Sequence, residues 1–220
     1  LIVRIPAPRI SAEGEEARGS MLKEAIFGFR YIFARPSLLG LQLIFFAGNL
    51  FAGIGYTVMA PMILARTGQN SLLFGTVQTA GAIGAVAGGV VMSAWGGGKR
   101  KVYTLLGAGA IGGLFLAALG LRVSLPLIAV CGVGLMFMGP FMNACSQAIW
   151  QAKVAPDVQG RVFAVRRTIA WSAMMVAPLL AAPLADKVFK PAMTEGGALA
   201  ALLGPIFGVG AGRGVGVLIT

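Results

Sequence analysis

Residues 38–64 form a charge-free stretch with the sequence LLGLQLIFFAGNLFAGIGYTVMAPMIL. The stretch lies within 30 uncharged residues between Arg35 and Arg66, and a helix needs about 20 apolar residues to cross the bilayer core. Runs such as Leu43-Ile44-Phe45-Phe46 do not alternate between polar and apolar residues, as the strands of a membrane β-barrel do. Because lipid offers no hydrogen-bond partners to open backbone, this stretch predicts a transmembrane helix.

Four more charge-free stretches follow, of 32, 20, 30 and 18 residues. The five together predict an all-α membrane protein with complete transmembrane helices at roughly 38–64, 72–95, 102–121, 125–150 and 168–185. A sixth apolar stretch begins near Arg213, and Leu1-Ile2-Val3-Arg4 resembles the end of an earlier apolar helix. We therefore expect a fragment of a longer protein, with five whole spans, a truncated sixth and a stub before the first.

Composition and charge agree with a membrane protein. Hydrophobic residues make up 57% of the chain and charged residues 11%, which is too apolar for disorder and too poorly charged for a soluble surface. The net charge of +11 would also suit nucleic acid, but the charges lie mostly in short segments beside the spans, so we expect the lipid bilayer and no nucleic acid as partner. With the segment before the first span in the cytoplasm, 13 of the 18 Lys and Arg lie inside, which favours that orientation.

Residues 1–36 predict a cytoplasmic linker that ends in an amphipathic helix, and residues 37–220 predict the transmembrane bundle. Ser20 is suited to cap that first helix. Apolar residues then follow the i, i+3, i+4, i+7 spacing of one helix face: Leu22, Ala25, Ile26, Phe29, Ile32 and Phe33. The pattern is typical of a helix that lies on the membrane surface, and the alternative is a ragged start of the first span.

Small residues recur at helical spacing along the second span. Two neighbouring ridges are formed by Gly81, Ala85, Gly89 and Ser93 and by Gly84 and Gly88. Such ridges let helix backbones approach closely in a membrane. Residues 107–112 match the dinucleotide fingerprint G-x-G-x-x-G, but no Asp or Glu occurs between Glu24 and Asp157, so we attribute these glycines to helix packing as well.

Catalytic and metal-ligating residues are scarce. The chain has no His, and none of its 7 Asp and Glu lies inside a predicted span. Paired carboxylates, Ser/His/Asp arrangements and metal sites are not visible, so we expect no enzyme activity, no cofactor and no metal. An intramembrane proton relay would need ionisable groups at depth, and the predicted spans contain none.

Uncharged polar residues do lie within the predicted spans. Gln42, Asn49 and Tyr56 recur every seven residues on the first span, and Asn143 and Gln147 are four apart on the fourth. Such residues either form hydrogen bonds between helices or line an aqueous cavity, and the sequence leaves both interpretations open. We take all five as candidate residues of a substrate cavity.

Two cytoplasmic loops resemble those of a known family. Residues 88–101, GGVVMSAWGGGKRK, resemble the second-half copy of the signature loop of the major facilitator superfamily, with Ser93 near the place of the loop's usual acid. Residues 151–163, QAKVAPDVQGRVF, are similar to the loop before the eleventh helix of bacterial macrolide and siderophore exporters, and residues 182–189 continue the likeness. The loop residues that carry the resemblance are Gly89, Ser93, Lys99, Arg100, Lys101, Asp157, Gln159, Gly160 and Arg161.

This resemblance implies the carboxyl-terminal half of a twelve-helix transporter, with the amino-terminal half of the same chain as its missing partner. It implies an antiporter in the bacterial plasma (inner) membrane that exports a small amphipathic substrate, such as a drug or siderophore, by alternating access. The first and fourth spans would correspond to helices seven and ten, which border the central cavity of this superfamily. The alternative function is a non-transporting membrane receptor or assembly subunit.

Asp157 and Arg161 are four residues apart, so a helical turn would bring the two side chains together. An exposed pair of this kind contributes little to stability. We therefore predict that Arg161 serves contacts with neighbouring helix ends or with the other half of the protein.

Overall fold

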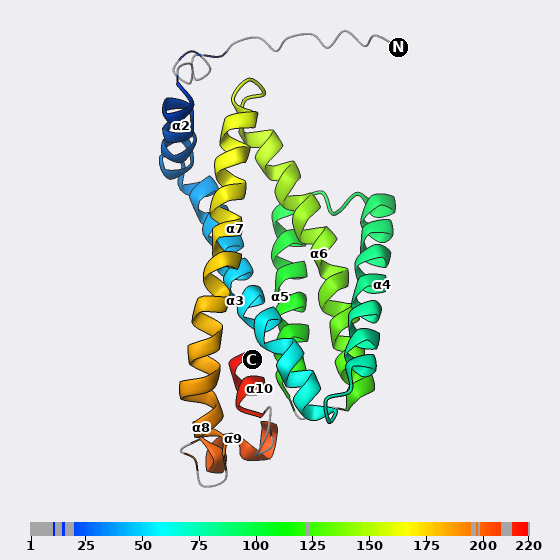
Figure 1. Cartoon of the computed structure of the whole chain (residues 1–220). Coiled ribbons are helices and arrows are strands. Elements are labelled where there is room, and N and C mark those ends of the chain that lie inside the picture. Colours follow the sequence, from blue (N-terminus) through cyan, green and yellow to red (C-terminus); the bar gives the residue numbers. More distant parts are fainter. Residues whose placement is uncertain are drawn as a thin grey trace.

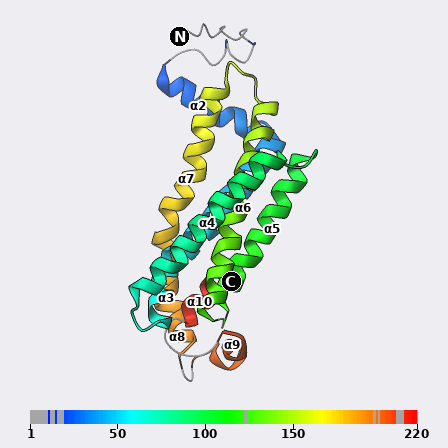
Figure 2. The same cartoon turned by 90° about the vertical axis from the view of Figure 1, so that its right-hand side faces the viewer.

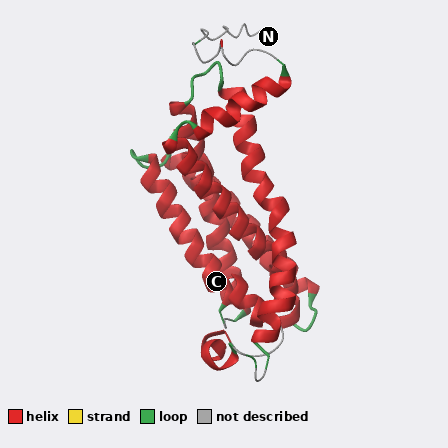
Figure 3. Ribbon diagram, turned by 90° about the vertical axis from the view of Figure 1, so that its left-hand side faces the viewer, coloured by secondary structure: helices red, strands yellow, loops and turns green. Residues whose placement is uncertain are grey.

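The computed structural model describes residues 11, 15, 20–121, 124–194, 197, 199–207 and 213–219. Within these residues the regular structure is helical, without strands (Figure 3). The elements are α2 (Met21–Phe33), α3 (Pro36–Arg66), α4 (Ser71–Trp95), α5 (Lys101–Gly120), α6 (Leu125–Lys153), α7 (Gln159–Pro183), the π-helix η1 (Leu184–Phe189), α8 (Lys190–Ala192), α9 (Ala200–Phe207) and α10 (Arg213–Ile219).

Five helical segments are long and apolar enough to cross a membrane: α3, α4, α5, α6 and the continuous segment from α7 to α8. Large apolar side chains on these segments are exposed, among them Met175 at 79% and Leu179 at 73%. Exposed apolar surface of this kind marks contact with lipid. The predicted fold class is confirmed: the chain is an all-α, multi-pass integral membrane protein.

The first four predicted spans agree with α3, α4, α5 and α6 to within three residues at each end. Local capping explains why the ends are sharp. At the start of α4 the Asn70 side chain accepts a hydrogen bond from the Leu73 N–H (3.1 Å), and Gly96 ends the helix with a left-handed φ of +70°. Ser20 caps α2 in the same way, as predicted, because its Oγ accepts from the Lys23 N–H at 3.4 Å.

The predicted start of the fifth span at residue 168 is wrong. Helix α7 begins nine residues earlier, at Gln159. The prediction counts only charge-free residues, whereas Arg161, Arg166 and Arg167 all belong to the helix. A membrane helix tolerates such charges where they face protein groups or a cavity, and Arg161 meets a carboxylate while Arg166 and Arg167 line a cavity.

The helices form two layers (Figures 1 and 2). In one layer α6 packs against both α4 and α5, and in the other α7 packs against both α3 and α2. In Figure 1, α2 and the loops α4–α5 and α6–α7 lie at one end of the molecule, and α8 and α9 lie at the other. We call these the α2 end and the α9 end.

Glycines set the distance between α4 and α6. A Cβ on Gly84 would lie 2.4 Å from the Val133 carbonyl oxygen, and a Cβ on Gly88 would lie 2.2 Å from the Phe137 carbonyl oxygen. The two backbones are therefore in contact along this ridge. On the other predicted ridge Gly81 also faces α6, where a Cβ would lie 3.3 Å from Met136 Cγ, whereas Gly89 has open space beside it. The closest approach to α6 is therefore at Gly84 and Gly88.

Amides join α3 to α7. Gln42 Nε2 donates to the Arg166 carbonyl at 3.2 Å, and Asn49 Nδ2 donates to the Ala170 carbonyl at 3.0 Å. Further along, Gly53 faces α7, and its missing Cβ would lie 2.6 Å from the Ala177 Cβ. This interface combines polar contacts with close packing.

Helix α2 packs on α7 through a face other than the predicted apolar one. Gly28 lies against Val165 of α7, and Tyr31 is buried in the same apolar cluster. Of the predicted apolar face only Ile32 is buried, whereas Leu22 is 71% exposed and Ala25, Ile26, Phe29 and Phe33 are exposed as well. Apart from Ile32, the predicted apolar stripe is exposed, which suits contact with lipid at the membrane surface.

The α9 end holds the largest of the apolar clusters in which the two layers meet. Side chains from all five spanning segments pack there, and the most deeply buried are Met62, Ile63, Leu119, Ile128, Ala177 and Ala181. Helix α10 contacts α3, α5 and η1, and its Leu218 packs against this cluster. Between residue 185 and α10 the structure describes residues 186–194, 197 and 199–207, which include the end of η1 together with α8 and α9.

Candidate binding cavity

A cavity of about 590 Å³ lies between the two layers, with walls from α3, α5, α6 and α7. Small-molecule sites have volumes of roughly 300 to 1,000 Å³. The apolar wall is made of aromatic rings and methionines: Phe45, Phe51, Tyr56, Phe163, Trp171, Met136, Met138 and Met142. The polar wall is made of amides and arginines: Asn49, Asn143, Gln147, Arg166 and Arg167.

Glycines keep this cavity open. Gly48, Gly113 and Gly139 line it, and no atom lies within 4 Å of the position that a Cβ would take on any of them. Gly109 and Gly112, from the stretch that matches G-x-G-x-x-G, line it as well. These glycines shape a cavity wall, a role beyond the helix packing that the sequence predicts.

Four of the five predicted cavity residues line this cavity: Asn49, Tyr56, Asn143 and Gln147. Asn49 also donates to α7, so it fits both interpretations that the sequence leaves open. Asn143 Nδ2 donates to the Gly139 carbonyl of its own helix at 3.1 Å, and the Tyr56 hydroxyl donates to Met136 Sδ at 2.9 Å. What these residues bind stays a prediction.

Gln42 lies outside the cavity. It is 2% exposed, and its Nε2 donates to the Arg166 carbonyl. Its Oε1 has no hydrogen-bond partner among the described residues. For Gln42 the geometry favours the interpretation of a hydrogen bond between helices.

Arg166 brings a positive charge into the cavity. Its Nη1 donates to Gln147 Oε1 and its Nη2 to Ser146 Oγ, both at 2.8 Å. Three aromatic rings surround the guanidinium carbon, with centres at 5.1, 5.9 and 6.0 Å: Trp150, Phe163 and Phe45. Cation–π attraction and the two hydrogen bonds hold the guanidinium in place.

Arg166 and Arg167 are not among the predicted site residues, because the charge-free criterion places both in a loop. A helical signal does extend upstream of residue 168. Three buried valines follow i, i+4, i+7 spacing there: Val158, Val162 and Val165. On a helix that includes these valines, Arg166 falls four residues before Ala170, and both line the cavity.

The α4–α5 loop turns sharply at two glycines. Gly96 and Gly97 have φ of +70° and +77°, a region that glycine adopts without steric cost. Lys101 Nζ donates to the Gly96 carbonyl, which closes the turn. Lys99 and Arg100 of the predicted basic cluster are exposed, and so is Ser93 in the last turn of α4.

The α6–α7 loop is closed by Gln159. Its Nε2 donates to the carbonyls of Val154 at 2.9 Å and Gln151 at 3.2 Å, at the end of α6. The next residue, Gly160, has open space beside it. Gln159 thereby satisfies two carbonyls that the end of a helix leaves unpaired.

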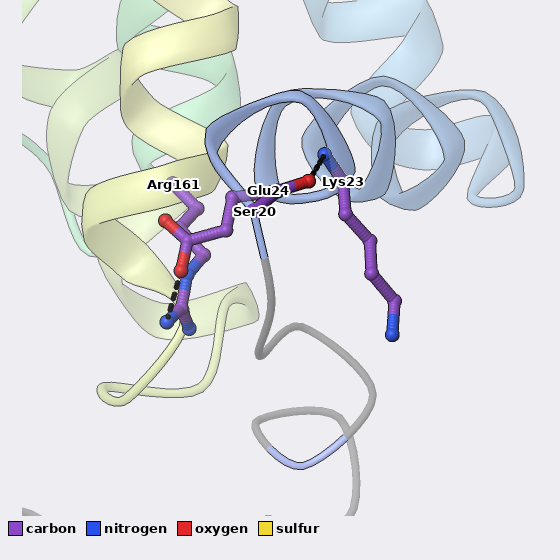
Figure 4. Close-up of polar contacts among 4 residues, drawn as sticks. All are labelled: Ser20, Lys23, Glu24 and Arg161. Carbon is purple, nitrogen blue, oxygen red and sulfur yellow. Dashed lines mark hydrogen bonds and ion pairs between the residues drawn. The ribbon is translucent and has the colours of Figure 1, made fainter.

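Arg161 pairs with α2, as Figure 4 shows: its Nη2 lies 3.0 Å from Glu24 Oε1. Asp157 precedes α7, because the helix begins at Gln159. The expected ion pair of Asp157 with Arg161 is not formed in the described residues: Arg161 pairs with Glu24, and Asp157 pairs with Ser11. Asp157 Oδ2 accepts from the N–H and the hydroxyl of Ser11, both at 2.7 Å, and these hydrogen bonds lower the pKa of the Asp157 carboxyl below its ordinary value. Arg161 therefore serves a neighbouring helix end, as predicted.

A wider depression of about 720 Å³ lies on the outer face of α4, and residues of that helix alone line it. The hydroxyls of Thr76 and Thr79 on this face donate to carbonyls one turn back in the same helix. A single helix does not enclose a ligand. The cavity between the layers is therefore the candidate binding site.

The cavity combines an aromatic and methionine wall with neutral amides and two arginines, which suits noncovalent binding of an amphipathic molecule. Loops 96–100 and 154–158 lie at the α2 end of the molecule. No protein-family model, curated protein or solved structure gives a significant match to this chain.

Proposed function

We propose that this chain is the carboxyl-terminal half of a secondary active transporter, similar to the major facilitator superfamily, that exports a small amphipathic compound across the bacterial plasma (inner) membrane. The observation that carries the proposal is the cavity of about 590 Å³ between the two helix layers. The resemblance of loops 88–101 and 151–163 supports the family. The amino-terminal half would supply the opposite wall and the groups that couple transport to an ion gradient.

The chemistry of the wall supports an amphipathic substrate. Methionine side chains adapt their shape to different ligands, and aromatic rings offer large rigid surfaces. The amides of Asn143 and Gln147 offer hydrogen bonds on the α6 side of the cavity. Few directional groups on a wide apolar wall suit a range of related compounds better than a single rigid one.

The position of the cavity along the helices supports alternating access. The two layers share apolar clusters at the α9 end and at the α2 end, and the cavity lies between these clusters, near the middle of the helices. A site near the membrane midplane is typical of transporters built from two rocking halves. In the proposed orientation the α2 end faces the cytoplasm, from which an exporter takes up its substrate.

The test is uptake into inverted membrane vesicles that carry the complete protein, energised with a pH gradient. Labelled anionic, neutral and cationic amphipathic compounds are offered in parallel. We expect gradient-dependent uptake of at least one compound, abolished by an uncoupler. Asn143→Ala should lower its rate several-fold, whereas Gln78→Ala, which removes an exposed amide on α4 outside the cavity, should leave the rate unchanged.

The absence of gradient-dependent uptake for the whole panel would contradict transport. A compound that binds but does not cross would instead favour the alternative, a non-transporting receptor or assembly subunit. If Asn143→Ala and Gln78→Ala lost uptake equally, transport would not depend on this cavity.

A further inference from the structure

The guanidinium of Arg166 has hydrogen-bonding capacity to spare. It carries five N–H donors, of which Gln147 and Ser146 accept two. The other three donors have no partner among the described residues, and the side chain lies in the cavity wall. Because both partners are neutral, hydrogen bonding leaves the positive charge itself uncompensated.

The described part of the chain supplies no carboxylate for this charge. The sequence has no Asp or Glu between Glu24 and Asp157, or between Asp157 and Asp186. These three carboxylates bind other side chains: Glu24 binds Arg161, Asp157 binds Ser11, and Asp186 binds Lys190. Arg167 adds a second positive charge to the same wall.

An uncompensated cation within a membrane protein is costly, and such residues typically face a cavity and mark a ligand pathway. The rings of Trp150, Phe163 and Phe45 hold the guanidinium without using its N–H groups. A planar guanidinium with free N–H groups matches the two oxygens of a carboxylate or phosphate. The methionine and aromatic side chains in the rest of the wall suit an apolar body.

We infer that the cavity binds an amphipathic organic anion, with its carboxylate, sulfonate or phosphate on the free N–H groups of Arg166 and its apolar body against the aromatic and methionine wall. This inference deepens the proposed function and rests on it for the passage of the ligand across the membrane. The binding step can be measured without transport, so the two can fail separately.

The experiment uses two probes that differ by one anionic group. 8-Anilinonaphthalene-1-sulfonate carries a sulfonate, and N-phenyl-1-naphthylamine is the same skeleton without it. The reporter is a cysteine at the cavity residue Asn143, made as Asn143→Cys in the complete protein with both natural cysteines replaced by alanine. It is alkylated with iodoacetamide, whose lack of charge makes its approach independent of Arg166. Each probe is scored by how far it slows alkylation in nanodiscs of zwitterionic lipid.

We expect the sulfonate probe to protect the cysteine at concentrations about tenfold lower than the neutral probe does. Arg166→Gln should abolish this preference, and Arg166→Lys should retain part of it, because the charge remains while the planar donors are lost. Arg30→Gln removes one positive charge from the exposed surface of α2 and should leave the preference unchanged.

Equal protection by both probes in the protein with Arg166 intact would overturn the inference, as would a preference that survives Arg166→Gln. The first result is also expected if a carboxylate elsewhere in the complete protein already pairs with Arg166. Nanodiscs that contain anionic phosphatidylglycerol identify the source of the anion. If that lipid alone slows alkylation in an Arg166-dependent way, the anionic group bound in the cavity is a lipid headgroup, and if it does not, the ligand is a free amphipathic anion.

Uptake of a neutral compound that is indifferent to Arg166→Gln would overturn the inference and leave the proposed transport standing. Conversely, Arg166-dependent protection by the sulfonate probe without gradient-dependent uptake of any compound would support the anion site and contradict transport.

Discussion

The helix interfaces within the two layers differ in their polar contacts. Between α4 and α6, Gly84 and Gly88 let the two backbones touch. A Cβ on either glycine would lie only 2.4 or 2.2 Å from a carbonyl oxygen of α6. Between α3 and α7, the amides of Gln42 and Asn49 reach across to backbone carbonyls at 3.2 and 3.0 Å. Both are ways in which helices associate in lipid, where apolar contact by itself brings little gain.

The difference explains where the cavity lies. Backbone contact has a short range, so a glycine interface is lost when the helices separate slightly. An amide at a helix interface can also accept a water molecule or a ligand group as partner, so it can border an aqueous space. Asn49 does border the cavity, whereas Gly84 and Gly88 are buried against α6.

The largest effect is expected where the glycine interface is broken. Gly88→Ala puts a Cβ against the Phe137 carbonyl and forces α4 away from α6, which should lower the free energy of unfolding by about 3 kcal/mol. The measurement is denaturant unfolding in detergent. Gly89→Ala is the matched control, because open space lies beside it, and it should change the free energy by less than about 0.5 kcal/mol. If both variants changed the free energy of unfolding equally, α4 and α6 would not be in close contact at Gly88.

Accessibility sharpens the distinction between amides that face the cavity and amides that join helices. Asn49→Cys and Asn143→Cys should react with a water-soluble thiol reagent about tenfold or more faster than Gln42→Cys, because only the first two positions line the cavity. A bound substrate should slow both fast reactions. If Asn49→Cys and Asn143→Cys reacted as slowly as Gln42→Cys, the polar residues would serve contacts between helices and would not line an aqueous cavity.

A smaller effect is expected where the amide interface is weakened. Gln42→Leu removes the hydrogen bond to the Arg166 carbonyl and should lower the free energy of unfolding by about 1 kcal/mol. Thr76→Val is the control, since its hydroxyl bonds within α4 alone, and it should leave that free energy nearly unchanged. If Gln42→Leu destabilised the protein as much as Gly88→Ala, the contrast between the two interfaces would disappear.

The smallest effect concerns the contact of Ser11 with Asp157, just before the start of α7. Because its hydrogen bonds lower the pKa of Asp157, their contribution to stability is present above the unfolded-state pKa of about 3.9 and is lost as pH falls through the lower folded-state value. Denaturant unfolding in detergent, followed from pH 7 to pH 3, should show a difference between the natural protein and Asp157→Asn that shrinks toward the acid end. Ser11→Ala should show the same pH dependence as Asp157→Asn, and a difference that grows on acidification would have the wrong sign.

Charge-free length is enough to predict four helices because lipid satisfies no backbone group, and each helix must therefore continue until water is reached. The start of α7 does not follow from this rule. Arg161 and Arg166 remain in the helix because Glu24, Gln147 and Ser146 stand beside them, and these partners come from distant parts of the chain. Tertiary contacts of this kind cannot be derived from the composition of one segment.

The candidate site shows the same division between local pattern and tertiary contact. A spacing of seven turns a helix by only about 20° per repeat, so Gln42, Asn49 and Tyr56 share one face, as the sequence predicts. The neighbour of this face changes along α3. At Gln42 it meets α7 directly, whereas at Asn49 and Tyr56 it borders the cavity between the layers.

Chain order gives the amide contacts of α3 a consequence for biogenesis. Ribosomal synthesis delivers α3 first and α7 last among the five spans, and the hydrogen bonds between them join residues 124 and 121 positions apart. Helices α4, α5 and α6 can assemble as consecutive neighbours, while Gln42 and Asn49 wait in the bilayer for their partners. Helix α7 then arrives with three arginines, each of which opposes translocon-mediated insertion. Integration of α7 therefore depends on α3 remaining close enough in the bilayer to form these hydrogen bonds.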